Sequence, residues 1–152
     1  MKERLNGYKA SPDAYQAILG LQAYVNECGL DHSLMELVKI RASQINGCAY
    51  CLHMHTRDAR KAGESEERLH LLAAWRESPL FTEKERAALA WTEALTLVAE
   101  TQAPDEVYEG LLPHFSGKEI VDLSTAIGTI NVWNRLAIGV RTLHPVGKSE
   151  AA

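Results

Sequence analysis

The sequence predicts an all-α protein that folds as a single domain over residues 1–152, and three observations support this class. Apolar residues recur at helical spacing along the chain, and no segment shows the strict alternation of a half-buried strand. Helix-start patterns recur at short intervals, while prolines stand at the expected breaks between helices. With 46% apolar and 24% charged residues, the 152-residue chain has a globular composition and enough length to bury a core.

The first two long helices are delimited by cap residues. Pro12 suits the first helical position, and Gly29 can end the helix that begins there. Ser33 and Glu36 have the spacing of a capping box, in which each side chain bonds the other residue's backbone amide. A second helix is therefore expected from Ser33 to Gly47. The apolar stripe of the first helix contains Ala14, Ile18, Leu21, Val25 and Cys28.

The rest of the chain predicts about five further helices, which gives a compact domain of six to seven helices. The cysteine-containing stretch after Gly47 has helix-compatible residues as far as Gly63. The following helices are expected from Ser65 to Trp75, from the capping box of Thr82 and Glu85 to Pro104, from Asp105 to Leu112, and from about Lys118 to Thr142 after the capping box of Ser116 and Glu119. The tail after His144 is expected to fray.

The longest of these helices is apolar around most of its circumference. At about 100° per residue its apolar side chains cannot share one stripe, so the helix must be buried on more than one side. One domain of this size can cover one broad face, and the other face would be a large exposed apolar patch. We therefore expect a homo-oligomer in which this helix adjoins the interface. The apolar side chains are Ile120, Val121, Leu123, Ile127, Ile130, Val132, Leu136, Ile138 and Val140.

Charge and hydropathy exclude several classes of function. The net charge of −4 comes from interspersed residues of both signs, and without a basic block the chain has little electrostatic basis for nucleic-acid binding. No apolar run reaches membrane-spanning length, and the start of the chain lacks the apolar core of a signal peptide. We therefore expect a cytoplasmic protein with no nucleic-acid partner and no membrane association. In a reducing compartment, a close pair of cysteines is typical of redox or metal sites rather than structural disulfides.

Cys48 and Cys51, within the stretch INGCAYCLHMH, form such a pair. Attachment of c-type haem requires histidine directly after the second cysteine, where this chain has Leu52. A zinc site needs four converging ligands, and a helix turning about 100° per residue would place both cysteines and His55 on one face but direct His53 elsewhere. The sequence has no second Cys/His element with metal-ligand spacing. No metal and no cofactor is therefore expected.

The same helix face suits redox chemistry. Cys48 directly follows Gly47, so it lies at a helix N-terminus, where the helix dipole favours the reactive thiolate. Cys51 and His55 are one turn apart, close enough for the imidazole to take the thiol proton. A second thiol one turn away can capture a sulfenic acid as a disulfide before it is oxidised further. The spacing therefore predicts a nucleophile, a base and a resolving thiol together.

The sequence around these residues, MELVKIRASQINGCAYCLHMHTRDARKAG, resembles the carboxymuconolactone decarboxylase-like superfamily, specifically its AhpD-like alkylhydroperoxidase branch. Later segments, AAWRES, FTEKERAALAWTEALT and INVWNRLAI, are also similar to that family. Family members have a glutamate twelve residues before the first cysteine and a histidine four after the second, which Glu36 and His55 match. The resemblance implies an AhpD-like all-helical homo-oligomer, often a trimer or hexamer, that reduces peroxides through Cys48 and Cys51.

The resemblance and the spacing together suggest a role for each site residue. Glu36 either caps the amide of Ser33 or joins a proton relay by contacting His55. We expect Cys51 to attack the peroxide because it lies one turn from the histidine. Cys48 would then resolve the sulfenic acid and be the exposed sulfur that meets the reductant, although the reverse order of the two cysteines stays open.

Three functions use these residues. The leading hypothesis is a thiol-dependent peroxidase of the alkylhydroperoxidase or peroxiredoxin type, with a hydroperoxide substrate and an unidentified dithiol reductant protein. The alternatives are a disulfide reductase or redox adaptor without a peroxide pocket, and a non-enzymatic redox or zinc sensor. The best-known AhpD proteins have a histidine where this chain has Tyr50, so that relay position is altered here. True carboxymuconolactone decarboxylases generally lack the cysteine pair, which argues against decarboxylation.

Overall fold

The computed structural model describes residues 1–146 and confirms an all-helical fold. These residues form nine α-helices and one short 3-10 helix, and they contain no strand. The elements are α1 (Gly7–Ala10), α2 (Pro12–Glu27), α3 (His32–Asn46), α4 (Ala49–Lys61), α5 (Glu66–Leu71), η1 (Leu72–Ala74), α6 (Glu83–Thr96), α7 (Val98–Thr101), α8 (Asp105–Glu109) and α9 (Gly117–Val140). Residues 147–152, which belong to the expected domain and its expected frayed tail, lie outside the described residues.

The number of helices exceeds the expected six to seven because the additional ones are short. Helix α1 has only four residues, too few to show an apolar period, and begins after the cap residue Asn6. The single helix expected from Thr82 to Pro104 is divided at Leu97, where the backbone leaves helical geometry with φ −102° and ψ 32°. The expected start of that helix is confirmed, since Thr82 and Glu85 form both bonds of the capping box.

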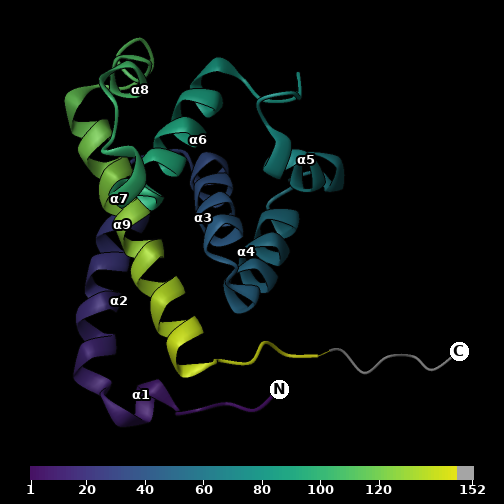
Figure 1. The fold of residues 1–152 in the computed structure, drawn as a ribbon, viewed down its shortest axis with the longest axis vertical. Coiled ribbons are helices and arrows are strands. Elements are labelled where there is room, and N and C mark those ends of the chain that lie inside the picture. Colours follow the sequence, from purple (N-terminus) through teal and green to yellow (C-terminus); the bar gives the residue numbers. More distant parts are fainter. Residues whose placement is uncertain (147–152) are drawn as a thin grey trace, which may run out of the picture.

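Helix α3 is the centre of the structure. It contacts α4, α6 and α9, and Figure 1 shows it between α9 and α4. Helices α2 and α9 pack against each other and run in opposite directions (Figure 1). Because α3 is enclosed in this way, every residue from Leu34 to Ile40 is buried, including the charged residues Glu36 and Lys39.

Two apolar clusters form the core, and α3 contributes to both. The first cluster joins α3 to α6 and α9; its buried members include Leu34, Met35, Val38, Trp91, Leu123 and Ile127. The second joins α3 to the segment from α4 to α6; its members include Leu37, Ile40, Ala59, Leu72, Trp75, Phe81 and Leu89. Because α3 has apolar side chains in both clusters, little of its central part is exposed to water. Any charged group on it must therefore find a partner inside the protein.

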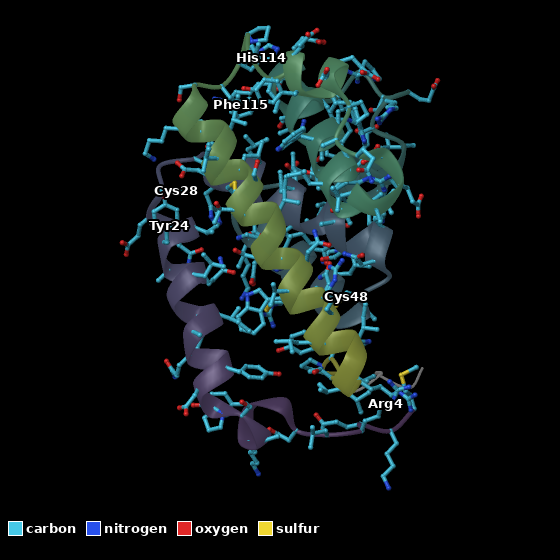
Figure 2. All side chains as sticks on the ribbon, turned by 60° about the vertical axis from the view of Figure 1, so that its left-hand side comes forward. Arg4, Tyr24, Cys28, Cys48, His114 and Phe115 are labelled. Atoms are coloured by element: carbon cyan, nitrogen blue, oxygen red, sulfur yellow. A yellow bond between two sulfur atoms is a disulfide. The ribbon has the colours of Figure 1, made fainter. Side chains whose placement is uncertain are left out.

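The long final helix α9 is only partly covered within one chain. It begins at the expected capping box of Ser116 and Glu119, and its inner side packs against α2, α3 and α6. Figure 2 shows α2 and α9 side by side. On the outer side of α9, Val121, Val132 and Ile138 remain exposed. Despite the length of α9, no helix within residues 1–146 is long and apolar enough to cross a membrane.

The start of α3 differs from the expectation. The cap residue is Asp31, whose side chain accepts a hydrogen bond from the Leu34 amide at 2.8 Å. The predicted capping box of Ser33 and Glu36 is wrong, because the helix starts two residues before the position that this pattern requires. Glu36 lies in the interior of the helix instead, and its carboxylate is free for another role.

Exchanging the two candidate cap residues tests this assignment. Asp31→Ala should lower the free energy of unfolding by about 1 kcal/mol, because an orphan amide of α3 loses its acceptor. Ser33→Ala should change it by only a few tenths of a kcal/mol, since alanine is a good residue in a first turn. Urea titrations at one fixed protein concentration measure both values. A larger loss for Ser33→Ala than for Asp31→Ala would restore the original capping box.

Candidate active site

A tight turn between α3 and α4 places the cysteines. Gly47 adopts the left-handed conformation with φ 69°, which favours glycine and ends α3. The Cys48 amide then bonds the Ser43 carbonyl at 3.0 Å, so the chain reverses within the last turn of α3. Helix α4 starts immediately afterwards with Cys48 as its cap residue. The expected position of Cys48 at a helix N-terminus is confirmed.

The two cysteines form a disulfide at the start of α4, with Cα atoms 5.4 Å apart. The Cys48 sulfur also accepts a hydrogen bond from the Cys51 amide at 3.4 Å. It therefore occupies the place where a capping side chain, or a thiolate, is stabilised by the free amides and the dipole of the helix. The expectation that Cys48 is the exposed sulfur is wrong in this structure: Cys48 and Cys51 are 1% and 2% exposed, and Cys51 is the cysteine that lines the adjoining pocket.

His55 and Glu36 form a buried pair one helical turn from Cys51. His55 Nδ1 lies 3.0 Å from Glu36 Oε2, and the two residues are 9% and 4% exposed. The glutamate comes from α3 and the histidine from α4, so the pair exists only because the two helices pack side by side. A carboxylate on one ring nitrogen fixes the orientation of the imidazole and leaves the other nitrogen to exchange protons.

The second oxygen of Glu36 is also occupied. Lys39 Nζ lies 2.8 Å from Oε1, and both side chains are buried. Burial by itself would raise the pKa of the Glu36 carboxyl, but the hydrogen bonds and charges of His55 and Lys39 outweigh it and lower that pKa to about 2. Glu36 is thus a carboxylate at neutral pH, held between two basic side chains.

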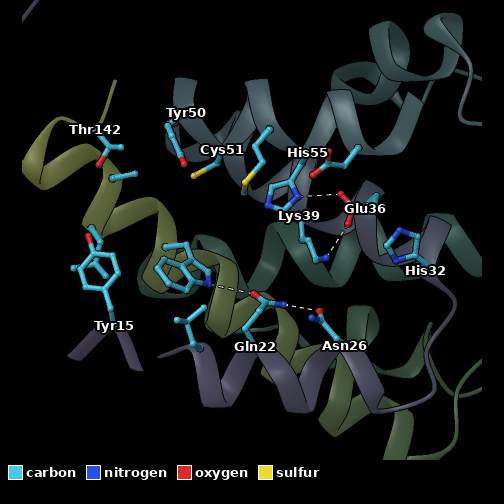
Figure 3. Close-up of a pocket in the computed structure, with 16 residues that line it drawn as sticks. Tyr15, Gln22, Asn26, His32, Glu36, Lys39, Tyr50, Cys51, His55 and Thr142 are labelled. Carbon is cyan, nitrogen blue, oxygen red and sulfur yellow. Dashed lines mark hydrogen bonds and ion pairs between the residues drawn. The ribbon is translucent and has the colours of Figure 1, made fainter. Parts of the chain in front are cut away.

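A pocket of about 820 Å³ opens onto this group. Figure 3 shows Tyr50, Cys51 and His55 on one wall, Glu36, Lys39 and His32 beside them, and Gln22 and Asn26 of α2 opposite. The lining also contains apolar side chains: Leu19, Met54, Trp133, Leu136 and Ala137. The pocket has room for an organic molecule much larger than hydrogen peroxide.

The remaining histidine of the cysteine stretch is directed elsewhere. His53 stacks on His144 with ring centroids 4.9 Å apart, and it does not line the pocket. Among residues 1–146, no group of three or more His, Cys, Asp or Glu side chains is arranged to hold a metal ion.

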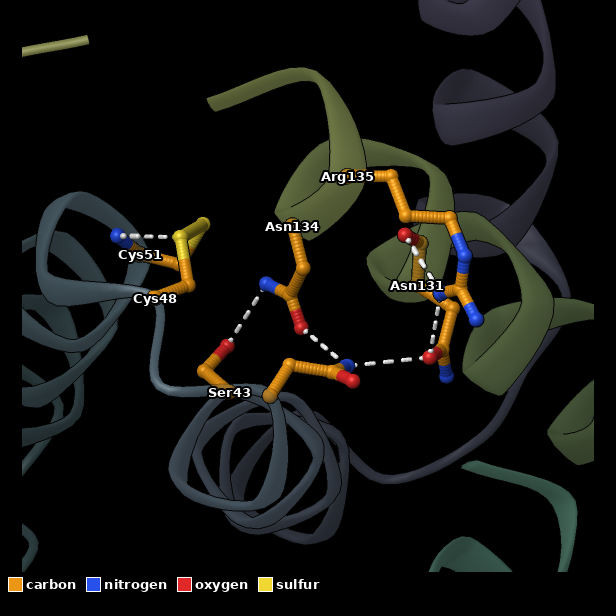
Figure 4. Close-up of a disulfide and its surroundings, with 7 residues drawn as sticks. Ser43, Cys48, Cys51, Asn131, Asn134 and Arg135 are labelled. Atoms are coloured by element: carbon orange, nitrogen blue, oxygen red, sulfur yellow. Dashed lines mark hydrogen bonds between the residues drawn. A yellow bond between two sulfur atoms is a disulfide. The ribbon is translucent and has the colours of Figure 1, made fainter. Parts of the chain in front are cut away.

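A buried polar network supports the turn that carries Cys48 (Figure 4). Asn134 of α9 is fully buried and donates to the Ser43 hydroxyl at 3.0 Å. Asn46 donates to the side-chain oxygens of both Asn134 and Asn131, at 2.9 and 3.0 Å. These bonds tie the last turn of α3 to α9, and Ser43 is also the residue whose carbonyl receives the Cys48 amide. The long final helix thus helps to fix the position of the disulfide.

Together, the fold and the site define an all-helical protein with a buried dithiol–disulfide pair beside a carboxylate–imidazole pair. Residues 12–94, from the start of α2 into α6, match the model of the carboxymuconolactone decarboxylase family. The chain therefore belongs to this family, and its resemblance to the AhpD-like branch is confirmed. The matched residues include both cysteines, Glu36 and His55.

Individual relatives agree with this placement. The uncharacterized protein YdfG of Bacillus subtilis is 39% identical and covers 92% of this chain and 95% of its own length. A solved structure from Agrobacterium tumefaciens, of unknown function but with a suggested AhpD role in antioxidant defence, is 51% identical and has a TM-score of 0.94 over 96% of this chain and all of its own. The debrominase Bmp8 shares only the fold, at 19% identity and a TM-score of 0.77 over 91% of this chain and 74% of its own.

Sequence reasoning found four residues of this site and missed others. Glu36, Cys48, Cys51 and His55 had been selected by spacing and resemblance, and the structure brings all four together. Lys39 was not selected, although its position one turn after Glu36 on the same helix is a signal that could have found it. The asparagines of α9 carry no such local signal, because their partners are about 90 residues away in the chain.

The low pKa of Glu36 predicts a specific acid sensitivity. A depressed carboxyl pKa contributes stability above the unfolded value of 4.5, and this contribution is lost as the pH falls toward about 2. Glu36→Gln should therefore show a shallower loss of unfolding free energy between pH 4.5 and pH 2 than the unchanged protein. Urea titrations across this range measure the slope. The control is Glu67→Gln, an exposed position; equal slopes for the two variants would contradict the buried pairing.

Proposed function

We propose that this protein is a thiol-dependent peroxidase that reduces organic hydroperoxides through Cys48 and Cys51. The observation that carries the proposal is the shared pocket: Cys51, His55 and Glu36 all line it, and His55 is paired with Glu36. A nucleophile, a base and a residue that orients the base thus face one cavity, which is the arrangement that an activated thiol requires. The similarity to an Agrobacterium protein with a suggested role in antioxidant defence supports the same class.

In the first step, Cys51 is the attacking residue because its sulfur reaches the pocket. His55 accepts the thiol proton, and the thiolate attacks one peroxide oxygen. The O–O bond breaks, the sulfur becomes a sulfenic acid, and the departing alkoxide takes the proton back from His55 and leaves as an alcohol. The Glu36 carboxylate stabilises the imidazolium that exists between these two proton transfers.

In the second step, Cys48 resolves the sulfenic acid. Its thiolate is favoured by the amide of Cys51 and the N-terminus of α4, and it lies within disulfide distance of Cys51. Attack on the Cys51 sulfur breaks the S–O bond, releases water after protonation, and forms the disulfide. The buried position of Cys48 suits this role, since a resolving thiol needs to reach only its neighbour.

A dithiol reductant completes the cycle at Cys51, the cysteine that lines the pocket. Its thiolate attacks Cys51 from the pocket, and Cys48 leaves as a thiolate stabilised at the helix N-terminus. The second thiol of the reductant then displaces Cys51 and is itself oxidised to a disulfide. The sum of the steps is one hydroperoxide and one dithiol converted to one alcohol, one water and one disulfide. This order replaces the earlier expectation that the reductant meets Cys48.

Oxidation of single-cysteine variants tests the proposed order. After one equivalent of cumene hydroperoxide, the reduced protein should form the Cys48–Cys51 disulfide, and Cys48→Ser should retain a sulfenic acid on Cys51 that dimedone traps. Cys51→Ser should react much more slowly, because Cys48 does not line the pocket. Mass spectrometry of peptides measures each product, with Cys28→Ser as the control. Fast oxidation of Cys48 in Cys51→Ser would reverse the order of the two cysteines.

A steady-state turnover assay distinguishes a peroxidase from a disulfide reductase or adaptor. A peroxidase turns over cumene hydroperoxide in the steady state when dithiothreitol is the only other reactant. A disulfide reductase or adaptor would exchange disulfides with dithiothreitol but consume no peroxide. Absence of turnover together with normal disulfide exchange would therefore replace the proposed function with the adaptor hypothesis.

Variants of the proposed relay should slow the oxidation step to different degrees. His55→Ala should decrease the rate of thiol oxidation by roughly 10²-fold, the usual scale for loss of a general base. Glu36→Gln should have a smaller effect, because it changes the orientation and charge around the imidazole without removing it. His53→Ala is the matched control, two residues away and outside the pocket. Stopped-flow measurement of thiol oxidation gives the rates, and equal rates for all three variants would exclude the relay.

We further propose that the protein is a homo-oligomer, as the exposed apolar residues of α9 suggest. Val121 and Ile138 are 64% and 45% exposed in the single chain, which places large apolar side chains in water. Light scattering at micromolar concentration should give a mass above that of one chain, and a trimer or hexamer is expected. Val121→Asp or Ile138→Asp should lower that mass without loss of helix content, whereas Leu112→Asp, at an exposed position outside α9, should not. A monodisperse monomer would contradict the proposal.

A further inference from the structure

Lys39 is a buried cation that the proposed chemistry does not yet use. It lies on α3 three residues after Glu36, is only 8% exposed, and lines the pocket together with Cys51 and His55. Its ammonium makes one ion pair, with Glu36 Oε1 at 2.8 Å. Lysine is among the residues least often buried, so a buried lysine beside a thiol needs a physical reason.

The geometry around Glu36 gives a physical reason for the buried lysine. The carboxylate uses its two oxygens on two different bases, Lys39 on Oε1 and His55 on Oε2. If the lysine were absent, one oxygen would have no partner in a buried site, and the side chain could turn away from His55. The ammonium thus restricts the rotation of the carboxylate and keeps Oε2 directed at the imidazole (Figure 3).

The charges around the thiols give a second reason for a lysine at position 39. Glu36 alone would give the pocket a net negative charge, which opposes formation of a thiolate. Lys39 balances the charge of Glu36, so this carboxylate does not offset the stabilisation of a thiolate by the N-terminus of α4 and by the imidazolium. Of the charged side chains that line the pocket, Glu36 is the one that contacts Lys39.

We propose that Lys39 is a positioning residue of this site: its ammonium clamps the Glu36 carboxylate against His55 and supplies the positive charge that favours the thiolate. This inference rests on the proposed thiol chemistry of the pocket and adds to it the residue that sets its charge. Lys39 acts by orienting Glu36 and by making the electrostatic potential at the thiols more positive, and it takes part in no bond-forming step.

Other titratable groups also line the pocket and contribute to its net charge. Helix α3 contributes His32 in addition to Glu36, α4 contributes Tyr50 and Asp58 in addition to His55, and α2 contributes Tyr15. The lining residues from α9 are Trp133, Leu136 and Ala137, none of which carries a charge. Asp58 is paired with Arg57 at 3.3 Å, outside the Glu36 group. Lys39 is therefore the lysine whose removal changes the charge of this pocket.

The experiment measures thiol reactivity without any peroxide. The reduced protein is alkylated with iodoacetamide over a range of pH, and the rate at Cys51 is followed by mass spectrometry. Lys39→Met and Lys39→Gln should both move the acid limb of this profile to higher pH, on the order of one pH unit, because removing a positive charge makes nearby protons harder to lose. Lys39→Gln keeps a hydrogen-bond donor to Glu36 and so remains foldable if the methionine variant is not.

Two further variants separate a functional charge from a structural one. Lys39→Arg keeps the charge and should restore most of the original profile, whereas a purely structural lysine would be poorly replaced by the larger guanidinium. Lys61→Met, at the exposed end of α4, is the matched control and should leave the profile unchanged. If Lys39→Gln folds and shows the original profile, or if Lys39→Arg is shifted as far as Lys39→Gln, the proposal is wrong. Because no hydroperoxide is used, this result is independent of whether the protein is a peroxidase.

Discussion

The burial of α3 is the constraint on which the rest of the structure depends. Seven consecutive residues, Leu34 to Ile40, are buried, each at most 8% exposed, because apolar clusters lie on both sides of the helix. An unpaired charge in such a helix would be severely destabilising, so Glu36 and Lys39 must be satisfied from within. Their pairing, completed by His55 from α4, satisfies a requirement of the fold and at the same time forms part of the pocket lining.

The cysteine pair depends on the same helix in a different way. Where α3 ends at Gly47, the backbone turns in the left-handed region and places Cys48 at the N-cap position of α4. The asparagine network from α9 holds the last turn of α3, so the long final helix contributes to the site through these hydrogen bonds. The disulfide is thus positioned by three helices, and disturbance of their packing would reach the thiols through this turn.

Several features could be predicted from sequence because their physical causes are local. Cap patterns located the starts of α2, α6 and α9, and a helical turn of about 100° per residue placed both cysteines and His55 together while directing His53 away. The errors have local explanations too. Asp31, and not Ser33, caps α3, although both residue types are common at helix starts. The short helix α1 has too few residues to show a helical period of apolar side chains.

The sequence by itself determined the helical class, the cysteine turn and the face of α4 that carries the candidate chemistry, since each depends on residues within a few positions of one another. Only the tertiary structure decided that Glu36 is a relay candidate rather than a cap, that Cys51 rather than Cys48 reaches the pocket, and that Lys39 completes the group. These outcomes depend on contacts between α3 and α4 and on what covers each sulfur. Burial and pairing across helices are properties of the packed fold, and no local pattern encodes them.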